Sequence, residues 1–338
     1  MNKAANILFV FSAVLILLSA CNDNDSSASP YDEILEHSPF KSLTDSIRLE
    51  PQNDDLYFRR AVLLNSNNFP EPALLDFEKA WSLKKNEEYA LGVSTLLLEK
   101  KPDSAVLFLN DAVKLLPNSL LLQLNLAHAY DQLQKTDEAL AICETILQQH
   151  PKQVDVMKMK ADLFIKKGKN NEATAILQNA YALTPFDVEL NYQLALQLAE
   201  TKNPKVLALC DSLIKADSAE AHAYPYYYKG IYYANTGENA KALAQFDEAI
   251  KTEYNFIDAY TEKGSLLYEM KKYNEALNVL NLSLNVKADN ANNFYWIARC
   301  QEALGNKAEA RLNYLRAWEL DKTFAEAKQA AEKIINEK

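Results

Sequence analysis

Three prolines that recur at a constant spacing constrain the fold of this chain more than any other sequence feature. Pro117, Pro151 and Pro185 follow one another at intervals of 34 residues. An alanine stands twelve residues before each proline: Ala105, Ala139 and Ala173. A fixed period of this length is typical of stacked supersecondary units that contact mainly their neighbours. The chain contains only six glycines, which favours helices joined by short turns over folds that need glycine-rich loops. The sequence therefore predicts an all-α repeat protein.

The repeat can be followed through most of the chain. We place eight units in residues 54–324, with a half repeat that forms an N-terminal cap helix in 31–53 and a C-terminal capping helix in 325–338. Seven units carry alanine at one position of their second helix: Ala73, Ala105, Ala139, Ala173, Ala242, Ala276 and Ala310. Val206 replaces it in the fifth unit. A small residue is expected there because the two helices of a unit cross at this point, and a larger side chain would overpack the crossing.

The sixth unit shows the pattern most clearly. It contains Tyr226, Gly230, Tyr233, Ala242, Phe246 and Ala249, and Gly264 and Ala298 repeat the position of Gly230. From residue 39 to the C-terminus, this pattern resembles the tetratricopeptide repeat family. The resemblance implies about eight helix-turn-helix repeats in a right-handed superhelix, with the first helix of every repeat lining a concave groove. Proline suits the first position of a helix, so we expect second helices to begin at Pro70, Pro102 and Pro204.

The first twenty residues have the composition of a targeting segment. Lys3 is followed by an apolar run from residue 7 to 18, and residues 18–21 read Leu-Ser-Ala-Cys. This order predicts a secretory signal peptide in 1–20. Its end resembles a bacterial lipobox, which implies that Cys21 is lipidated and begins the mature protein. The alternative is an uncleaved transmembrane anchor, for which the segment is at the short limit.

Residues 21–30 combine the lipidated cysteine with a short polar tether that has no apolar surface to bury. Asp23 and Asp25 resemble export signals of surface lipoproteins, but a plain polar linker has the same composition, and both interpretations stay open. Asn22 is not the aspartate that retains some lipoproteins in the inner membrane. We therefore expect an outer-membrane lipoprotein of a bacterial cell envelope, on the periplasmic face or the cell surface.

The predicted groove differs between the two halves of the chain. Its N-terminal half is mixed and includes Asp55, Phe58, Ser94, His128, Asp131, Asp155, Lys158 and Asp162. The C-terminal half is rich in aromatic residues, and we predict that a partner binds there to Tyr192, Tyr224, Tyr227, Tyr268, Tyr295, Trp296 and Arg299. Clustered aromatic side chains with an arginine are typical of binding hot spots. Packing between helices is the alternative role for these tyrosines, and we expect it for Tyr226 and Tyr233.

Several classes of function find no support in the sequence. The formal net charge of −10, without a basic stripe, argues against nucleic acid as a partner. The four histidines, His37, His128, His150 and His222, form no pair with metal-ligand spacing, so we expect no metal and no cofactor. Phosphate-binding and catalytic motifs are lacking. Cys143, Cys210 and Cys300 are expected to be buried free thiols.

The sequence thus predicts a membrane-anchored, non-enzymatic scaffold that holds a protein or an extended peptide in its groove. The family's clamp for a C-terminal carboxylate is absent, because Phe58, Val62 and Leu91 occupy its positions. The alternative function is a surface lipoprotein that binds a glycan or nutrient by stacking it on Tyr227 and Trp296, together with Tyr268. The oligomeric state is not indicated by the sequence.

Overall fold

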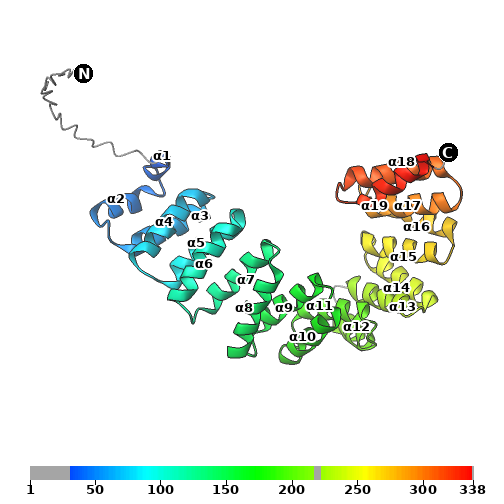
Figure 1. Cartoon of the computed structure of the whole chain (residues 1–338), viewed down its shortest axis with the longest axis horizontal. Helices are drawn as coiled ribbons and strands as arrows, with labels where there is room; N and C mark the ends of the chain where they lie inside the picture. The colour runs from blue at the N-terminus through cyan, green and yellow to red at the C-terminus, as the bar shows by residue number, and fades with distance from the viewer. Residues whose placement is uncertain (1–30, 217–221, 337–338) are drawn as a thin grey trace, which may run out of the picture. The chain divides into compact units, whose positions relative to one another are not determined.

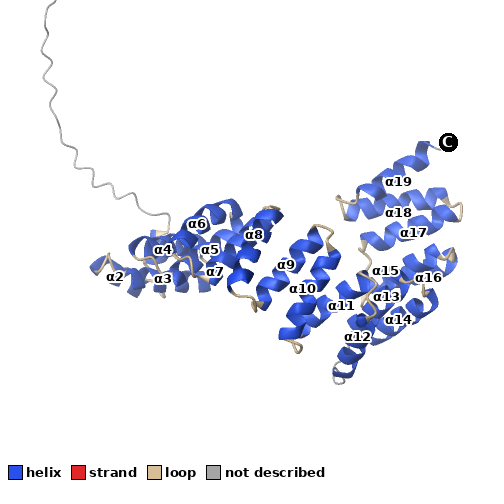
Figure 2. Cartoon of the chain, turned by 60° about the horizontal axis from the view of Figure 1, so that its bottom comes forward, coloured by secondary structure: helices blue, strands red, loops and turns tan. Residues whose placement is uncertain are grey.

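The structure is a computed structural model that describes residues 31–216 and 222–336. Within these ranges it contains 19 helices and no strand, which confirms the predicted all-α class. Figure 2 colours the described chain as helices and loops alone. None of the helices in these ranges has both the length and the apolar character that a membrane crossing requires. The predicted signal peptide, Cys21 and the tether in 21–30 lie outside the described residues. The chain divides into two compact units, Met1–Leu96 and Leu97–Lys338, which are described separately.

The first unit begins with a single-turn helix that the sequence did not predict. Its helices are α1 (Asp32–Leu35), α2 (Lys41–Leu49), α3 (Asp54–Ser66), α4 (Pro70–Leu83) and most of α5 (Glu87–Lys100). The helix expected between residues 31 and 53 is α2. It is joined to α1 by the Thr44 hydroxyl, which donates to the Leu35 carbonyl at 2.9 Å. Helix α4 begins at Pro70, as expected for a proline that has no amide hydrogen to leave unbonded.

The second unit contains the remaining helices. They are α6 (Pro102–Leu115), α7 (Leu120–Gln132), α8 (Thr136–Gln149), α9 (Val154–Lys166), α10 (Asn170–Leu183), α11 (Val188–Glu200), α12 (Lys205–Ala216), α13 (Tyr224–Asn235), α14 (Asn239–Thr252), α15 (Ile257–Glu269), α16 (Tyr273–Val286), α17 (Ala291–Ala303), α18 (Lys307–Leu320) and α19 (Ala325–Asn336). Figure 1 shows successive helix pairs, and α7–α8, α9–α10 and α13–α14 each pack together. Helix α12 begins at Lys205, one residue after its expected start at Pro204.

The alanine register predicted from the sequence marks the centre of the packing. All seven alanines and Val206 are fully buried, with 0% exposure. They lie in the second helices of the repeats. The branched Val206 occupies the alanine position in α12 and is as completely buried as the alanines.

The turns between the two helices of a repeat need a residue with positive φ, and in this chain several of these residues are not glycine. A residue with positive φ follows the first helix in seven repeats: Asn68, Gln134, Gly168, Lys202, Gly237, Lys271 and Gly305. The backbone N–H of the residue after each of them donates a hydrogen bond to a carbonyl in the last turn of the first helix. After Gly168, for example, the Lys169 N–H donates to the Phe164 carbonyl at 2.8 Å. This left-handed end is a common helix C-cap, normally made with glycine or asparagine. Here Gln134, Lys202 and Lys271 adopt it at the cost of some backbone strain.

A recurring ion pair joins consecutive repeats in the second unit. A lysine near the middle of a first helix reaches an acid of the preceding second helix. The pairs are Lys160 with Glu144 at 3.2 Å, Lys229 with Asp211 at 2.7 Å, and Lys263 with Asp247. The lysine side chains are only 16–19% exposed, whereas their acids are more than half exposed. The lysine stems therefore pack between helices while the ammonium groups stay at the surface.

Candidate binding groove on the first helices of the repeats

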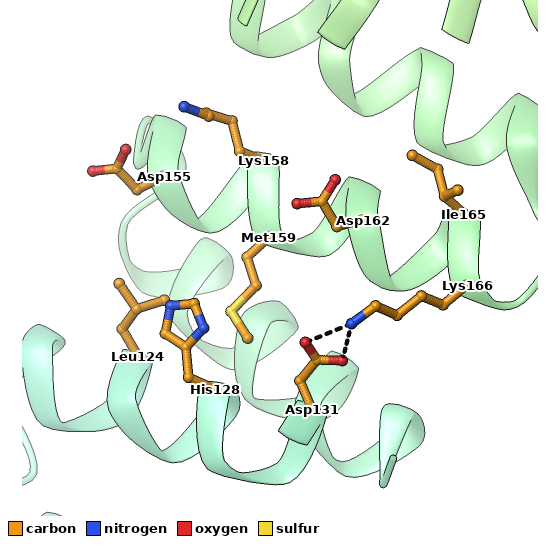
Figure 3. Close-up of a pocket in the computed structure, with 9 residues that line it drawn as sticks. All are labelled: Leu124, His128, Asp131, Asp155, Lys158, Met159, Asp162, Ile165 and Lys166. Atoms are coloured by element: carbon orange, nitrogen blue, oxygen red, sulfur yellow. Dashed lines mark hydrogen bonds and ion pairs between the residues drawn. The ribbon is translucent and has the colours of Figure 1, made fainter. Parts of the chain in front are cut away.

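A cavity of about 450 Å³ lies between two first helices, α7 and α9 (Figure 3). Its walls come from both helices: Leu124, His128, Asp131, Asp155, Lys158, Met159, Asp162, Ile165 and Lys166. Figure 3 shows the α7 side chains facing those of α9 across the cavity. Five of the groove residues predicted from the sequence are brought together here: His128, Asp131, Asp155, Lys158 and Asp162.

Charge in this first cavity is largely compensated. Lys166 donates to both carboxylate oxygens of Asp131, at 2.6 and 2.7 Å. Burial raises the pKa of the Asp162 carboxyl, against a hydrogen bond from the Gln193 amide that lowers it. The Asp131 carboxylate of α7 thus pairs with Lys166 of α9 across the cavity. Within the described ranges, no three potential ligands gather around a metal position.

A second cavity, of about 370 Å³, lies on the same row of helices between α11 and α13. It is lined by Glu189, Tyr192, His222, Tyr224 and Tyr228. An ion pair connects the two cavities, because Lys158 of the first binds Glu189 of the second. The hydrogen bond to Glu189 raises the pKa of Lys158. The two cavities are therefore neighbours on one surface formed by α7, α9, α11 and α13.

The second cavity is the open side of an aromatic group that we call the tyrosine cluster. Its members are Tyr192, Tyr224, Tyr227, Tyr228 and Phe256, and their rings contact one another in tilted or edge-on pairs with centroids 4.8–6.4 Å apart. Tyr224 is 43% exposed, whereas Tyr228 is 6% exposed. Burial raises the pKa of both Tyr227 and Tyr228, so these phenols stay protonated. The tyrosines thus differ in exposure: the Tyr224 ring is accessible to solvent, and the buried Tyr228 ring packs against it.

The other predicted site residues form a separate arginine cluster on α15 and α17. The Arg299 guanidinium stacks over Tyr268, Trp296 and Tyr295, at 4.6, 5.1 and 5.9 Å from the ring centroids. It also donates to the Tyr268 hydroxyl at 3.2 Å. A guanidinium that contacts three rings and donates a hydrogen bond to one of them is restricted in orientation before any partner binds. The seven predicted residues therefore occupy two clusters instead of one continuous row.

Carboxylates gather beside the tyrosine cluster on α11 and α15. The pKa of Glu262 is raised to about 7, first by loss of solvent and then by the negative charges of Glu200, Asp258 and Glu269. Partial desolvation also raises the pKa of Glu200. Asp258 and Glu262 lie on α15, which begins directly after Phe256, and the ring centroid of Phe256 is 5.2 Å from that of Tyr227. Besides burial, these two acids and Glu200 also raise the pKa of Tyr227. This arrangement concentrates negative charge where water is partly excluded, so it attracts cations strongly.

Sequence reasoning missed Tyr228, His222, Phe256 and Glu262. A signal was present, because Tyr228 and Glu262 stand at the sixth position of the first helix in their units, as do Met159 and Trp296. The groove was predicted from positions two, five, nine and twelve alone. Met159 and Tyr228 line the two cavities, so the sixth position also belongs to this surface.

The three cysteines of the described residues are far from any reactive arrangement. Cys143, Cys210 and Cys300 are each fully buried, as expected, and none is in a disulfide. Burial raises the pKa of Cys143 and Cys300 to about 11 and that of Cys210 to about 12. Thiolates are the reactive form of cysteine, so these thiols are inert in the folded protein.

Comparisons with known proteins agree with this architecture. Models of the tetratricopeptide repeat match residues 96–163, 257–290 and 293–321. A tetratricopeptide repeat protein from Parabacteroides merdae ATCC 43184 has a similar structure, with a TM-score of 0.62 and 18% identity over 73% of this chain and 98% of that chain. The type IV pilus biogenesis factor PilW has a TM-score of 0.49 and 19% identity over 63% of this chain and 97% of that one.

A curated relative matches at the level of sequence. Superkiller complex protein 3 of Mus musculus is 23% identical over 150 residues, which make up 44% of this chain. The match spans 10% of the length of that protein, so it concerns a run of repeats and not the whole relative. Residues 96–163, 257–290 and 293–321 are thus matched as tetratricopeptide repeats, and the paired helices and the buried alanine register extend the same helical architecture through the described residues.

Proposed function

We propose that this protein is a scaffold that binds a partner protein, through an extended segment, on the first-helix surface of its second unit. The proposal rests mainly on the ion pair between Lys158 and Glu189. Lys158 lines the cavity between α7 and α9, and Glu189 lines the cavity between α11 and α13, so the two cavities lie side by side. An extended peptide offers side chains at regular intervals, so it can fill a row of small cavities that no compact ligand would span.

The chemistry of the surface supports a protein partner. Exposed tyrosine and a stacked arginine are the residue types that dominate the binding energy of protein interfaces. A sugar would need an open ring face on which to stack. In the arginine cluster, Arg299 already covers Tyr268 and Trp296, and in the tyrosine cluster the rings contact each other. These contacts favour the scaffold over the glycan-binding alternative.

The cellular setting belongs to the same proposal. The Leu-Ser-Ala-Cys sequence at residues 18–21 supports lipidation of Cys21 and anchoring in a bacterial outer membrane. The polar stretch 22–30 would then hold the repeats about 30 Å or less from the lipid surface. The protein is proposed to act without catalysis, by holding its partner near the membrane.

Site-specific crosslinking tests the binding surface. Tyr224→p-benzoylphenylalanine replaces an exposed ring of the second cavity with a photoreactive one, and Tyr254→p-benzoylphenylalanine is the matched control. Tyr254 lies between α14 and α15 and is 67% exposed. We expect illumination of intact cells to give discrete protein adducts from position 224 and not from 254. Equal adducts from both positions, or none from 224, would contradict the proposal.

Anchoring has its own test. Cys21→Ser removes the thiol that would carry the lipid, so we expect the protein to move from the membrane fraction to the soluble fraction. Cys300→Ser is the control, since that thiol is buried. A Cys21→Ser protein that stays with the membrane would contradict lipidation at this residue and favour an uncleaved anchor.

A further inference from the structure

We infer that the surface of α11, α13 and α15 selects a basic segment of the partner, whose lysine or arginine side chains enter the cavity of the tyrosine cluster and meet the carboxylates beside it. This inference rests on the proposed function and adds the chemical class of the bound segment. It depends on three features: the uncompensated charge, the aromatic walls and the accessibility of the cavity.

Among residues 31–216 and 222–336, no lysine or arginine balances the negative charge of Glu262 and its neighbours. No lysine or arginine is among the groups that act on Glu262. Helix α11 contains neither residue type, and α13 and α15 contain one lysine each. Those two, Lys229 and Lys263, bind Asp211 and Asp247 of the preceding second helices. The lysines of α13 and α15 therefore pair with acids of the second helices and not with the carboxylates beside the tyrosine cluster.

This absence of compensation contrasts with the neighbouring cavity. Between α7 and α9, Lys166 pairs with Asp131, and Lys158 reaches Glu189. There Asp131 and Glu189 each have a lysine partner. Between α11 and α15 the acids act on one another, which is unfavourable until a positive charge arrives from outside. A cationic partner therefore gains more at the tyrosine cluster than at the first cavity.

The aromatic walls suit the same kind of side chain. Tyr192, Tyr224 and Tyr228 surround a cavity of about 370 Å³, with ring centroids 5.8–6.4 Å apart. The faces of aromatic rings attract an ammonium or guanidinium group, and the attraction increases when water is excluded. The long apolar stem of lysine or arginine would pack on the rings while its charge meets a carboxylate.

Proton uptake by Glu262 links this binding to pH. Its neighbours are Glu200 on α11, Tyr227 on α13, and Asp258 and Glu269 on its own helix. None of them is cationic. With its pKa raised to about 7, Glu262 is partly protonated at neutral pH. A bound cation favours the ionised form, so binding releases a proton, and affinity rises as the pH increases from 6 to 8.

The test measures binding of two synthetic peptides to the full chain by fluorescence anisotropy at low salt. One is a fluorescein-labelled decapeptide of alternating lysine and serine, and the other carries Nε-acetyllysine in place of every lysine. We expect the lysine peptide to bind and the acetylated peptide to bind at least about tenfold more weakly, since acetylation removes the charge. We also expect the affinity for the lysine peptide to rise between pH 6 and pH 8.

Matched variants separate this site from general attraction to an acidic protein. Glu200→Gln with Glu262→Gln removes two charges at the site, and Glu172→Gln with Glu319→Gln removes two exposed charges from α10 and α18. We expect the first pair to weaken binding of the lysine peptide about tenfold and to abolish its pH dependence, and the second pair to change affinity less than about twofold. Circular dichroism at 222 nm confirms that each variant remains helical.

Two results would overturn the inference. Equal losses from both pairs of variants would mean non-specific attraction, and equal binding of the acetylated peptide would mean that the rings alone recognise the segment. The proposed function is judged separately, by crosslinking from position 224. If that crosslinking succeeds while Glu200→Gln with Glu262→Gln binds the captured partner normally, the scaffold stands and the basic specificity fails.

Discussion

Gly230 lies directly against the ring of Phe246 where α13 and α14 cross. A β-carbon placed on Gly230 would be 2.5 Å from Cε1 of Phe246, and the ring is fully buried. The next repeat has the same arrangement, since a β-carbon on Gly264 would lie 2.5 Å from Cδ2 of Leu280. The glycines of these first helices are therefore required by helix contact and not by backbone conformation.

Gly230→Ala is expected to destabilise the protein in spite of the better helix propensity of alanine. Propensity favours alanine by up to about 1 kcal/mol, but overpacking a buried crossing costs about 1–3 kcal/mol. Urea denaturation measures the difference in the free energy of unfolding. Phe246→Leu in the same protein would relieve the contact, so the double variant should lose less than the sum of the two single variants. A more stable Gly230→Ala protein would contradict this account.

Removing one partner of the buried ion pair between Arg60 and Asp76 is expected to lower the free energy of unfolding more than replacing both partners by apolar residues. Arg60 donates to Asp76 at 2.6 Å from Nε and 2.8 Å from Nη2, and it donates to Thr44 at 3.0 Å. Both paired side chains are 9% exposed. Asp76→Ala leaves a buried unpaired guanidinium and should cost about 3–5 kcal/mol, whereas replacing both residues by leucine should restore much of that stability. Chemical denaturation compares the two proteins, and equal stabilities would refute the prediction.

Glu262 is expected to make stability decrease as pH rises through neutrality. Its folded-state pKa of about 7 lies above the value of about 4.3 for an unfolded chain, so the folded state binds the extra proton. Its stabilising contribution is complete below pH 4 and is lost as the pH rises from about 4 to 8, by on the order of 2–3 kcal/mol. Glu262→Gln should remove this loss.

Denaturation of the wild-type and Glu262→Gln proteins at pH 5 and pH 8 measures that contribution. The relevant quantity is the difference between the two proteins at each pH, because other groups also titrate in this range. Glu319→Gln, an exposed carboxylate on α18, is the matched control. A Glu262→Gln protein with an unchanged dependence on pH would show that this carboxylate ionises normally.

The three buried thiols are expected to be unreactive until the protein unfolds. With pKa values raised to about 11 and about 12, less than about 1% of Cys143, Cys210 and Cys300 is thiolate at pH 8. In a Cys21→Ser protein, a thiol reagent such as dithionitrobenzoate should react slowly in buffer and rapidly in denaturant. Fast reaction of any thiol in the native protein would contradict the burial.

Much of the groove could be predicted from the sequence, because a fixed period places equivalent residues on equivalent surfaces. Tyr192 and Tyr224 were expected to face it, and both line the second cavity. Tyr228 and Glu262 were missed, since their sixth position lies at the edge between the groove and the contact with the next helix. Which side such a residue faces depends on how far one repeat is rotated against the next, and no single repeat sequence specifies that rotation.

The sequence by itself determined the helices, their pairing and the alanine register, since these depend on spacing and residue size within one repeat. Ala242 and the six equivalent alanines are fully buried where the two helices of a repeat cross, and a small side chain lets the helices approach closely there. Only the tertiary structure decided the electrostatics. Arg60 is buried between α3 and α4, and Asp76 compensates its charge. Glu262 has no such partner. Charge compensation acts over a few ångströms in space, so it depends on which repeats and side chains the fold brings together, and that information is not contained in the period.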